Sequence, residues 1–221
     1  MRRRAAASGG ADEAMTTQRD TLRRLTLPAS FYARPAELVA RALLGQTLVH
    51  ETDEGLCAGR IVETEAYLAC GDRGCHAALG MTPRNSVMWE PPGTVYVYVI
   101  HTHRMLNAVT GAAGFPEAVL IRALEPLCGT ETMRKRRGFE RPRDLTGGPG
   151  NLTQALGIDT AHNRTMLDRP PLYVSRAAVP AREVIATTRI GLSEGRGQDL
   201  PLRYLFADSD CISIRPRERL R

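Results

Sequence analysis

The segment RIVETEAY, residues 60–67, carries two acids and a tyrosine at alternate positions of an otherwise apolar run. Successive side chains of a β-strand point to opposite faces, so Glu63, Glu65 and Tyr67 would share one face. The two carboxyl groups would then lie roughly 6–7 Å apart along the strand. Paired acids suit general acid–base catalysis, whereas the simpler interpretation is that arginine side chains bind them.

Paired acids also permit a carbohydrate-active function. In inverting glycoside hydrolases, two carboxyl groups roughly 6.5–9.5 Å apart protonate the leaving group and activate water. A glycoside hydrolase that uses Glu63 and Glu65 is therefore an alternative. Sugar sites need aromatic platforms, however, and aromatic residues make up only 5% of the chain, with a single tryptophan.

Motifs for metals and nucleotides are weak. CGDRGCH (70–76) lacks the second ligand pair of a zinc site, and HTH (101–103) is a short His-x-His segment. LTGGPGNLTQAL (145–156) has glycines leading into a helix, whose N-terminal N–H groups can bind an anion, but no P-loop lysine follows them. We therefore predict no metal and no cofactor, and a phosphate contact at the start of this helix.

The net charge of +6 suits a polyanionic partner. Arginine supplies 29 of the 30 basic residues, and Lys135 is the single lysine. MRKRRGFERPR (133–143) concentrates basic residues at the end of a predicted helix and in the loop behind it. This cluster is either a solvated helix face or a surface that contacts phosphates.

The elements that must position these residues indicate an α+β fold. Runs of β-branched residues bounded by Gly or Pro predict strands, and apolar periodicity between Pro35 and Gly45 predicts a helix. We expect a single domain over residues 26–221, with a curved, mainly antiparallel sheet and peripheral helices. The predicted strands are 46–52, 59–67, 93–101, 118–126, 172–175, 184–190, 203–206 and 211–214, and the helices 34–45, 129–138 and 151–158.

Two long segments lie outside these elements. Residues 68–93 contain Cys, His, Arg, Met and the single Trp, a composition unlike that of disordered chains, which predicts an ordered, functional loop. Residues 1–25 are rich in Arg, Ala, Gly, Ser and Thr without apolar periodicity, which predicts a disordered basic tail.

Five segments in order resemble the alkyladenine (3-methyladenine) DNA glycosylases of the mammalian type, which also occur in bacteria. They are GRIVETEAYL, TPRNSVMWEPPGTVYVYVI, LIRALEPLCGTETMR, LTGGPGNLTQALGI and PLRYLFADSDCISI, and the resemblance runs from about residue 35 to 215. It implies a monofunctional enzyme that flips a damaged purine, of the 3-methyladenine or hypoxanthine type, out of duplex DNA. Such an enzyme hydrolyses the N-glycosidic bond in base excision repair.

The resemblance implies catalytic roles for two residues. Glu65 matches the glutamate that activates the attacking water, and Arg122 matches the arginine that helps hold this water. Glu63 is left with a structural ion pair or a supporting role. A non-catalytic DNA-binding relative would have lost Glu65 or Tyr67, and both are present.

The resemblance also implies a pocket for the flipped base. Tyr67 and Tyr98 match its two aromatic walls. His76 matches a histidine that packs on the base and hydrogen-bonds near the sugar. Asn107 matches an asparagine that disfavours the 2-amino group of guanine.

The sequence departs from the family pattern where DNA would be contacted. HTHRML (101–106) replaces a segment that is one residue longer and supplies an intercalating tyrosine, so His101 is predicted to fill that role, with Met105 as the alternative. Asn151 stands where the family usually has lysine. The predicted contacts to the DNA backbone are Arg84, Arg134, Arg136, Arg137, Gly150 and Asn151.

The cellular setting follows from simple features. No apolar run is long enough to span a membrane, and MRRRAAASGG at the start lacks the apolar core of a signal peptide. The five cysteines are odd in number and scattered, which indicates free thiols in a reducing compartment. We therefore expect a cytoplasmic, nucleoid-associated monomer whose partner is double-stranded DNA containing damaged purines.

Overall fold

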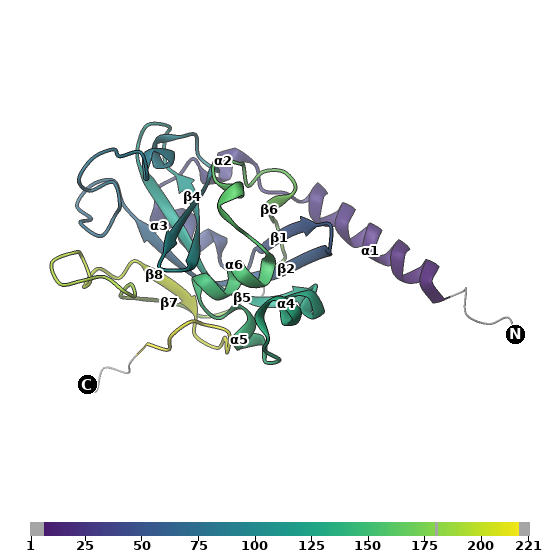
Figure 1. Ribbon diagram of the computed structural model, residues 1–221. Coiled ribbons are helices and arrows are strands. Elements are labelled where there is room, and N and C mark those ends of the chain that lie inside the picture. Colours follow the sequence, from purple (N-terminus) through teal and green to yellow (C-terminus); the bar gives the residue numbers. More distant parts are fainter. Residues whose placement is uncertain (1–6, 180, 217–221) are drawn as a thin grey trace, which may run out of the picture.

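An eight-stranded, curved antiparallel sheet organises the computed structural model, which describes residues 7–179 and 181–216 (Figure 1). Six strands follow the order β3-β4-β5-β2-β1-β6, and β8 pairs with both β2 and β7. Their bounds are β1 Thr47–Thr52, β2 Gly55–Tyr67, β3 Val95–Ile100, β4 His103–Thr110, β5 Glu117–Cys128, β6 Leu172–Ser175, β7 Val184–Thr187 and β8 Arg203–Phe206. The predicted α+β fold with an antiparallel sheet is confirmed.

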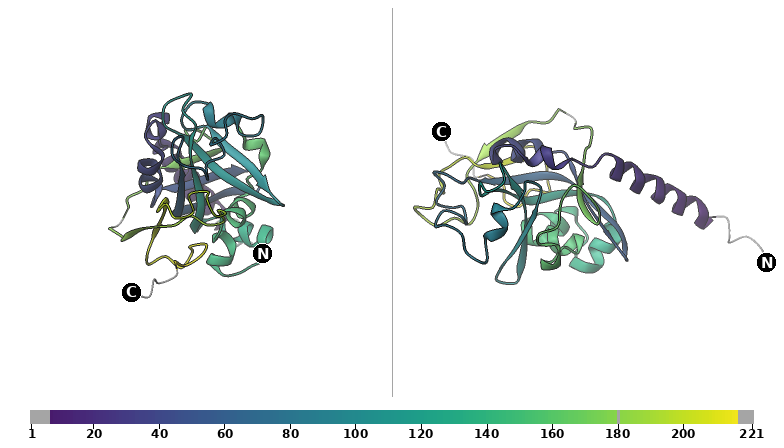
Figure 2. Two further views of the ribbon diagram at one scale, coloured as in Figure 1. Left: turned by 90° about the vertical axis from the view of Figure 1, so that its left-hand side faces the viewer. Right: turned by 90° about the horizontal axis from the view of Figure 1, so that it is seen from above.

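Helices cover the sheet from two sides. Viewed from above in Figure 2, α2 and α3 lie on one side of the sheet, and the group α4 to α6 lies on the other. On α3, the buried residues Ala36, Val39, Ala40 and Leu43 repeat with the spacing of one helix face. The helices are α1 Ala7–Arg24, α2 Ala29–Tyr32, α3 Ala36–Leu43, α4 Thr130–Arg137, α5 Pro142–Thr146 and α6 Pro149–Leu156, with 3₁₀ turns η1 Ser86–Trp89 and η2 Thr160–His162.

Strand β2 runs through the centre of the molecule. It pairs with β5 along one edge and with β1 and β8 along the other, so that both of its edges are hydrogen-bonded within the sheet. Val62 and Ala66 belong to the main hydrophobic core, and the Thr64 hydroxyl donates to the carbonyl of Ala40 on α3, 2.9 Å away. The other face carries Glu63 and Glu65, both fully buried. The alternation predicted from the sequence therefore separates a core face from an acidic face.

The N-terminal segment differs from the prediction. Residues 7–24 form α1, so the predicted disorder is wrong for this part of the tail, and residues 1–6 lie outside the described residues. Arg23 at the end of α1 donates through Nε to Glu51 on β1 at 2.8 Å, and Leu22 packs against a small cluster of buried apolar residues around Tyr173. Both contacts are long-range, which is why composition alone missed them. Figure 1 shows α1 projecting away from the sheet.

Two strand predictions also need correction. The sequence analysis missed β4, because His103, Arg104 and Asn107 interrupt its apolar pattern; pairing with β3 and β5 on its two sides makes it a strand. Residues 211–214 form no strand. The amide of Ser213 donates instead to the Glu63 carboxylate at 2.6 Å.

Candidate active site

Arg122 on β5 links the two acids of β2. Its Nε donates to Glu63 Oε1 at 2.9 Å, and its Nη1 lies 3.2 Å from Glu65 Oε2. All three side chains are buried, with 7% of Arg122 and none of either glutamate exposed. Burial lowers the pKa of Arg122, but the charges of Glu65 and Glu63 outweigh this and raise it. The guanidinium therefore stays charged between the two acids.

Glu63 is saturated by protein donors. Besides Arg122, its carboxylate accepts from Arg203 Nε at 2.7 Å, from the Ser213 amide at 2.6 Å and from the Ser213 hydroxyl at 2.7 Å. Burial raises its pKa, but the charges of Arg122 and Arg203 and the bonds from Ser213 outweigh it, so the pKa is lowered. Its hydrogen-bonding capacity is thus used within the protein. A pair of acids bridged by arginine gives no support to an inverting glycoside hydrolase, which needs open space for water and sugar between its acids.

Glu65 has a different environment. Its Oε1 accepts from the backbone amide of Ile190 at 2.8 Å, and its Oε2 accepts from the Tyr67 hydroxyl at 2.8 Å. These bonds and Arg122 fix the carboxylate beside Tyr67. The pKa of Tyr67 is raised well above its ordinary value, first by burial and then by Glu65, so the phenol remains protonated and donates.

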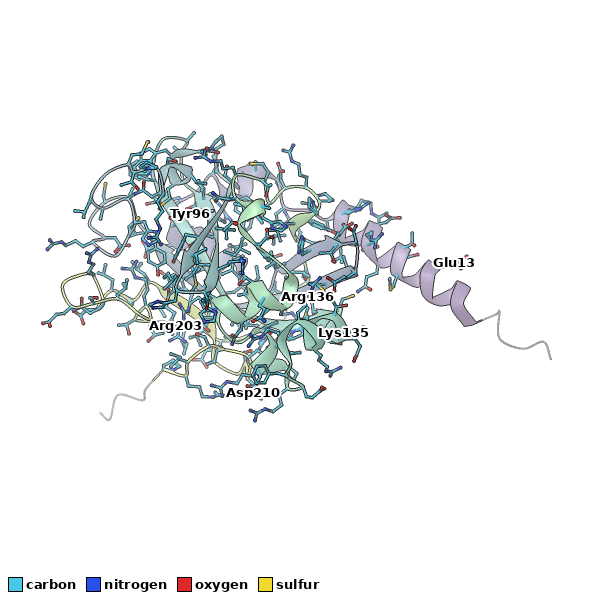
Figure 3. The ribbon with its side chains drawn as sticks, viewed as in Figure 1. Glu13, Tyr96, Lys135, Arg136, Arg203 and Asp210 are labelled. Atoms are coloured by element: carbon cyan, nitrogen blue, oxygen red, sulfur yellow. The ribbon has the colours of Figure 1, made fainter. Side chains whose placement is uncertain are left out.

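Tyr67 forms one wall of a narrow aromatic recess. The ring centroids of His76 and Tyr98 are 4.6 Å apart, and those of Tyr96 and Tyr98 are 5.3 Å apart (Tyr96 is labelled in Figure 3). Planar rings pack favourably against such edge-to-face and tilted groups. The recess is lined by Tyr67, His76, Met88, Tyr96, Tyr98, Asn107 and Ala118.

His76 is held in the recess by its loop and by Tyr96. Its Nδ1 lies 3.0 Å from the Tyr96 hydroxyl, and Asn85 Nδ2 donates to its carbonyl at 2.8 Å. Burial, and then the charge of Arg84, lowers the pKa of His76, so the ring is neutral at neutral pH. The predicted long loop is ordered, with Met88 among its buried residues.

Asn107 reaches the recess from β4. It is 2% exposed, and its Nδ2 donates to the carbonyls of Tyr96 and Met105, both at 3.1 Å. These two bonds fix the orientation of the side-chain amide. A rigid polar group in an otherwise aromatic recess can discriminate between rings that differ by one substituent.

A wider cleft opens from this recess and brings further elements together. It shares Tyr67, His76 and Tyr98 with the recess. Its other lining residues are Gly74, Ile100, Met105, Leu120, Arg122, Pro149, Ile190, Gly191 and Leu192. Because Pro149 is the first residue of α6, the predicted anion contact at Gly150 and Asn151 lies beside the mouth of the site.

Gly150 and Asn151 have defined neighbours there. A Cβ added to Gly150 would lie 2.8 Å from the His103 ring, so glycine permits the close approach of α6 to the start of β4. Asn151 Nδ2 donates to the carbonyl of Gly147 at 3.0 Å. The side chain of Asn151 is thus occupied by its own loop.

The β3–β4 hairpin carries His101 at its tip. His101 has φ 53° in a two-residue turn closed by the pair Ile100 and His103, and it is exposed. Left-handed φ values are typical of such tight hairpin turns. Nearby, Arg84 Nη2 donates to the carbonyl of Val99 at 3.2 Å, and its guanidinium carbon lies 5.6 Å from the Tyr98 ring centroid. Arg84 and His101 therefore flank the mouth of the site.

The structure does not bring the basic cluster on α4 to this site. Arg136 contacts Cys57 Sγ at 3.8 Å, and Cys57 precedes Tyr67 by ten positions on β2, which corresponds to about 30 Å. Figure 3 shows Lys135 and Arg136 well separated from Tyr96. The arginines of the cluster bind other groups of this protein. Arg134 pairs with Glu131 and Glu140, Arg136 pairs with Glu54, and Arg137 donates to Gln154.

Three contributors were not predicted from the sequence. Strand alternation from Tyr98 could have found Tyr96, since both lie on the same strand face. Met88 and the Ile190 amide carry no local signal.

Among the described residues, no group of three or more His, Cys, Asp or Glu side chains could hold a metal ion. No helix in the described ranges is both long and apolar enough to cross a membrane.

Three tyrosines and a histidine line this narrow recess, and the buried Glu65 carboxylate lies at its edge. Aromatic walls can stack on a flipped nucleobase and a carboxylate can act as a general base, the two functions that an enzyme releasing a nucleobase by hydrolysis needs. Residues 30–210 match the family model described as methylpurine-DNA glycosylase. The chain belongs to the methylpurine-DNA glycosylase family.

Curated relatives agree with this assignment. The chain is 46% identical to a protein of Bacillus licheniformis over 189 residues, which cover 85% of this chain and 96% of the relative. It is 47% identical to a protein of Methanoculleus marisnigri over 196 residues, covering 86% and 100%. A protein of Chlorobium phaeobacteroides is 44% identical over 190 residues, covering 85% and 94%. Each of the three carries the name "Putative 3-methyladenine DNA glycosylase".

Proposed function

We propose that this protein excises alkylated and deaminated purines, of the 3-methyladenine and hypoxanthine type, from duplex DNA and leaves an abasic site. The observation that carries the proposal is the Glu65 carboxylate, which is fully buried, bonded to Tyr67 at 2.8 Å and paired with Arg122 at the edge of an aromatic recess. The names of the relatives, which mention 3-methyladenine, support the alkylated purines of this substrate class.

Glu65 acts as the general base in this proposal. A water beside its carboxylate attacks the sugar carbon C1′, and Glu65 takes the proton of that water. The bond between C1′ and the base nitrogen breaks, and the base leaves with the electron pair. A purine alkylated on N3 is cationic before cleavage and leaves as a neutral base. Arg122 holds Glu65 in position, with its Nη1 3.2 Å from Glu65 Oε2, and its positive charge complements that of the buried carboxylate.

The recess binds the flipped base. The rings of Tyr67 and Tyr98 form its walls, His76 packs against the base near the sugar, and Asn107 disfavours a purine with a 2-amino group. The low pKa of His76 supports this role, since a neutral imidazole accepts a cationic alkylated base without charge repulsion. The buried Tyr96 hydroxyl, 3.0 Å from His76, holds that ring in its orientation.

We infer that His101 fills the gap left in the base stack. Flipping a nucleotide costs a few kcal/mol of unstacking, which a planar or apolar side chain offsets by inserting into the duplex. Exposure at the hairpin tip beside the mouth supports His101 for this role. Met105, which lines the cleft, is the alternative. Imidazole is smaller than phenol, so we expect a preference for lesions that are already poorly paired.

Phosphate contacts complete the proposal. Arg84, Gly150 and Asn151 beside the mouth are candidates for the DNA backbone. Arg134, Arg136 and Arg137 remain candidates, although their internal ion pairs and hydrogen bonds reduce what they can offer to phosphates. We further infer that the protein works as a monomer on nucleoid DNA, which sedimentation of the protein alone and with a lesion duplex would test.

One assay tests the function. A duplex with a single hypoxanthine, and a second with a single methylated purine, are incubated with the protein and then with alkali, which cleaves DNA at abasic sites. We expect strand cleavage after alkali for the wild type and none above background for Glu65→Gln. If the wild type produces no more abasic sites than Glu65→Gln on either duplex, the proposed function is wrong.

A further inference from the structure

A fully buried ion pair lies beside the candidate active site. Arg189 and Asp72 have side chains with no exposed area. The guanidinium binds the carboxylate as a fork, with Nη1 to Oδ2 and Nη2 to Oδ1 both at 2.6 Å. Burying two charges costs several kcal/mol per ion, and apolar replacements of such pairs are often neutral or stabilising. Stability alone therefore gives a weak reason for this pair.

The pair connects two loops to the strand that carries the catalytic groups. Asp72 accepts from the amides of Leu68 at 3.0 Å and Gly74 at 2.9 Å, which orders the chain directly after β2. Arg189 Nη1 donates to the carbonyl of Ala66 at 3.0 Å. Ala66 lies between Glu65 and Tyr67 in the chain. The bond therefore fixes the backbone between the proposed general base and the aromatic wall of the recess.

The two loops also approach each other closely at Gly74. A Cβ at this position would lie 2.7 Å from the Arg196 carbonyl oxygen and 3.0 Å from Arg189 Nη2. Only a residue without a side chain allows this contact. Because His76 follows Gly74 by two positions, the loop that supplies His76 and the loop that begins at Arg189 form one packed unit.

Arg189 contacts the Tyr67 ring and its chain neighbour contacts Glu65, while Arg189 itself does not line the recess. Its guanidinium carbon lies 4.6 Å from the Tyr67 ring centroid, within the range of a cation–π contact. Its chain neighbour Ile190 donates the amide hydrogen bond to Glu65 Oε1 at 2.8 Å. Arg189 therefore packs against one face of Tyr67, and the amide of Ile190, the next residue in the chain, orients one oxygen of Glu65.

We propose that Arg189 is a positioning residue for base excision, and that Asp72 anchors it. Arg189 backs the Tyr67 ring from behind and fixes the Ile190 amide on Glu65. This inference rests on the proposed function of Glu65 and Tyr67. It predicts that loss of the fork moves these two groups by a fraction of an ångström or more, and misplacement by about 1 Å can cost about 100-fold in rate.

The test compares Arg189→Met and Arg189→Lys with a matched control, Arg182→Met. Arg182 also forms a fork, with Nη1 and Nη2 at 3.1 and 3.0 Å from Glu125, and it stacks 4.4 Å from the Phe206 ring. Neither Glu125 nor Phe206 lines the recess or its cleft. The variants are assayed under single-turnover conditions on a hypoxanthine duplex, with enzyme in excess, together with affinity for undamaged DNA and the melting temperature.

We expect Arg189→Met to lower the single-turnover rate constant by about 10- to 100-fold with unchanged affinity for undamaged DNA. Arg189→Lys keeps the charge but not the fork, so its rate should be intermediate. Arg182→Met should lower the melting temperature and leave the rate constant of the folded enzyme unchanged. A merely structural role would lower the concentration of folded enzyme, which active-site titration measures separately, and would leave the rate constant at saturating enzyme unchanged.

Two results would overturn the inference: a wild-type rate constant in Arg189→Met, or an equal loss of rate in Arg182→Met. If Arg189→Met does not fold, Arg189→Lys decides, since an unchanged rate constant in that variant also contradicts the inference. If the wild type itself excises no base, the proposed function is contradicted. This outcome differs from a wild-type rate that Arg189→Met retains, which contradicts only the role of Arg189.

Discussion

Replacing Glu65 with glutamine should nearly abolish excision while the protein still folds and binds the lesion. The amide keeps the shape of the carboxylate but cannot take a proton from water. Loss of a positioned general base costs about 10²–10⁴ in rate, which corresponds to about 2.7–5.5 kcal/mol in the activation free energy. The measurement is the single-turnover rate constant on a hypoxanthine duplex, with lesion affinity measured separately.

The contacts of Glu65 also set the cost in stability. Its carboxylate accepts hydrogen bonds from the Ile190 amide and the Tyr67 hydroxyl and forms an ion pair with Arg122. Glutamine has a single side-chain oxygen, which can face either the Ile190 amide or Arg122. The N–H group on the other side would then face the NH₂ group of the glutamine. A buried donor left without a partner costs about 1–3 kcal/mol. For a chain of this size, each kcal/mol lowers the melting temperature by roughly 2–4 °C.

Glu63→Gln is the matched control, because it changes the same atoms two residues away. Glu63 accepts from Arg122, Arg203 and Ser213, and its replacement leaves two buried arginines with one carboxylate. Breaking a buried pair costs about 3–5 kcal/mol, so we expect the larger loss of stability in this variant. Its folded fraction should keep far more activity than Glu65→Gln. A lower rate constant for Glu63→Gln than for Glu65→Gln, both corrected for folded enzyme, would refute the assignment of the two acids.

Four further outcomes are expected. Borohydride should trap no covalent adduct with DNA, because a Schiff base needs an amine and Lys135 lies on α4, away from the recess. An adduct that disappears in Lys135→Ala would contradict a monofunctional enzyme. His76, followed by NMR, should titrate below about 6.5, so that the folded protein loses stability as the pH falls below that value; Arg84→Gln should raise the pKa of His76, and no change would exclude Arg84 as a cause. His101→Ala should lower activity on duplex substrates and spare single strands carrying the same lesion, whereas equal losses on both would mean that the wedge lies elsewhere. Binding should weaken steeply with salt, and neutralising Arg134 with Lys135, which leaves the structural arginines of α4 intact, should reduce the salt slope if α4 contacts phosphates; an unaltered slope removes α4 from the interface.

The sequence alone determined features that depend on local periodicity. Alternation along β2 directs Glu63, Glu65 and Tyr67 to one face, and the structure confirms this through their shared contacts with Arg122 and with one another. Helix α3 follows from its apolar spacing in the same way. Composition also predicts the ordered loop at 68–93, because Cys, Met, His and the single Trp give this segment apolar surface that disordered segments lack.

The tertiary structure alone decided how distant residues meet. His76 and Tyr96 are 20 positions apart, and the Ile190 amide reaches Glu65 across 125 positions. Neither contact leaves a local pattern, since strand register and loop packing bring the groups together. The basic run on α4 likewise depends on the fold: local charge predicts a DNA surface, and the structure adds that Arg136 pairs with Glu54 and Arg137 donates to Gln154 on neighbouring elements. Residue type fixes what a side chain can bind, while the fold decides which partner lies within reach.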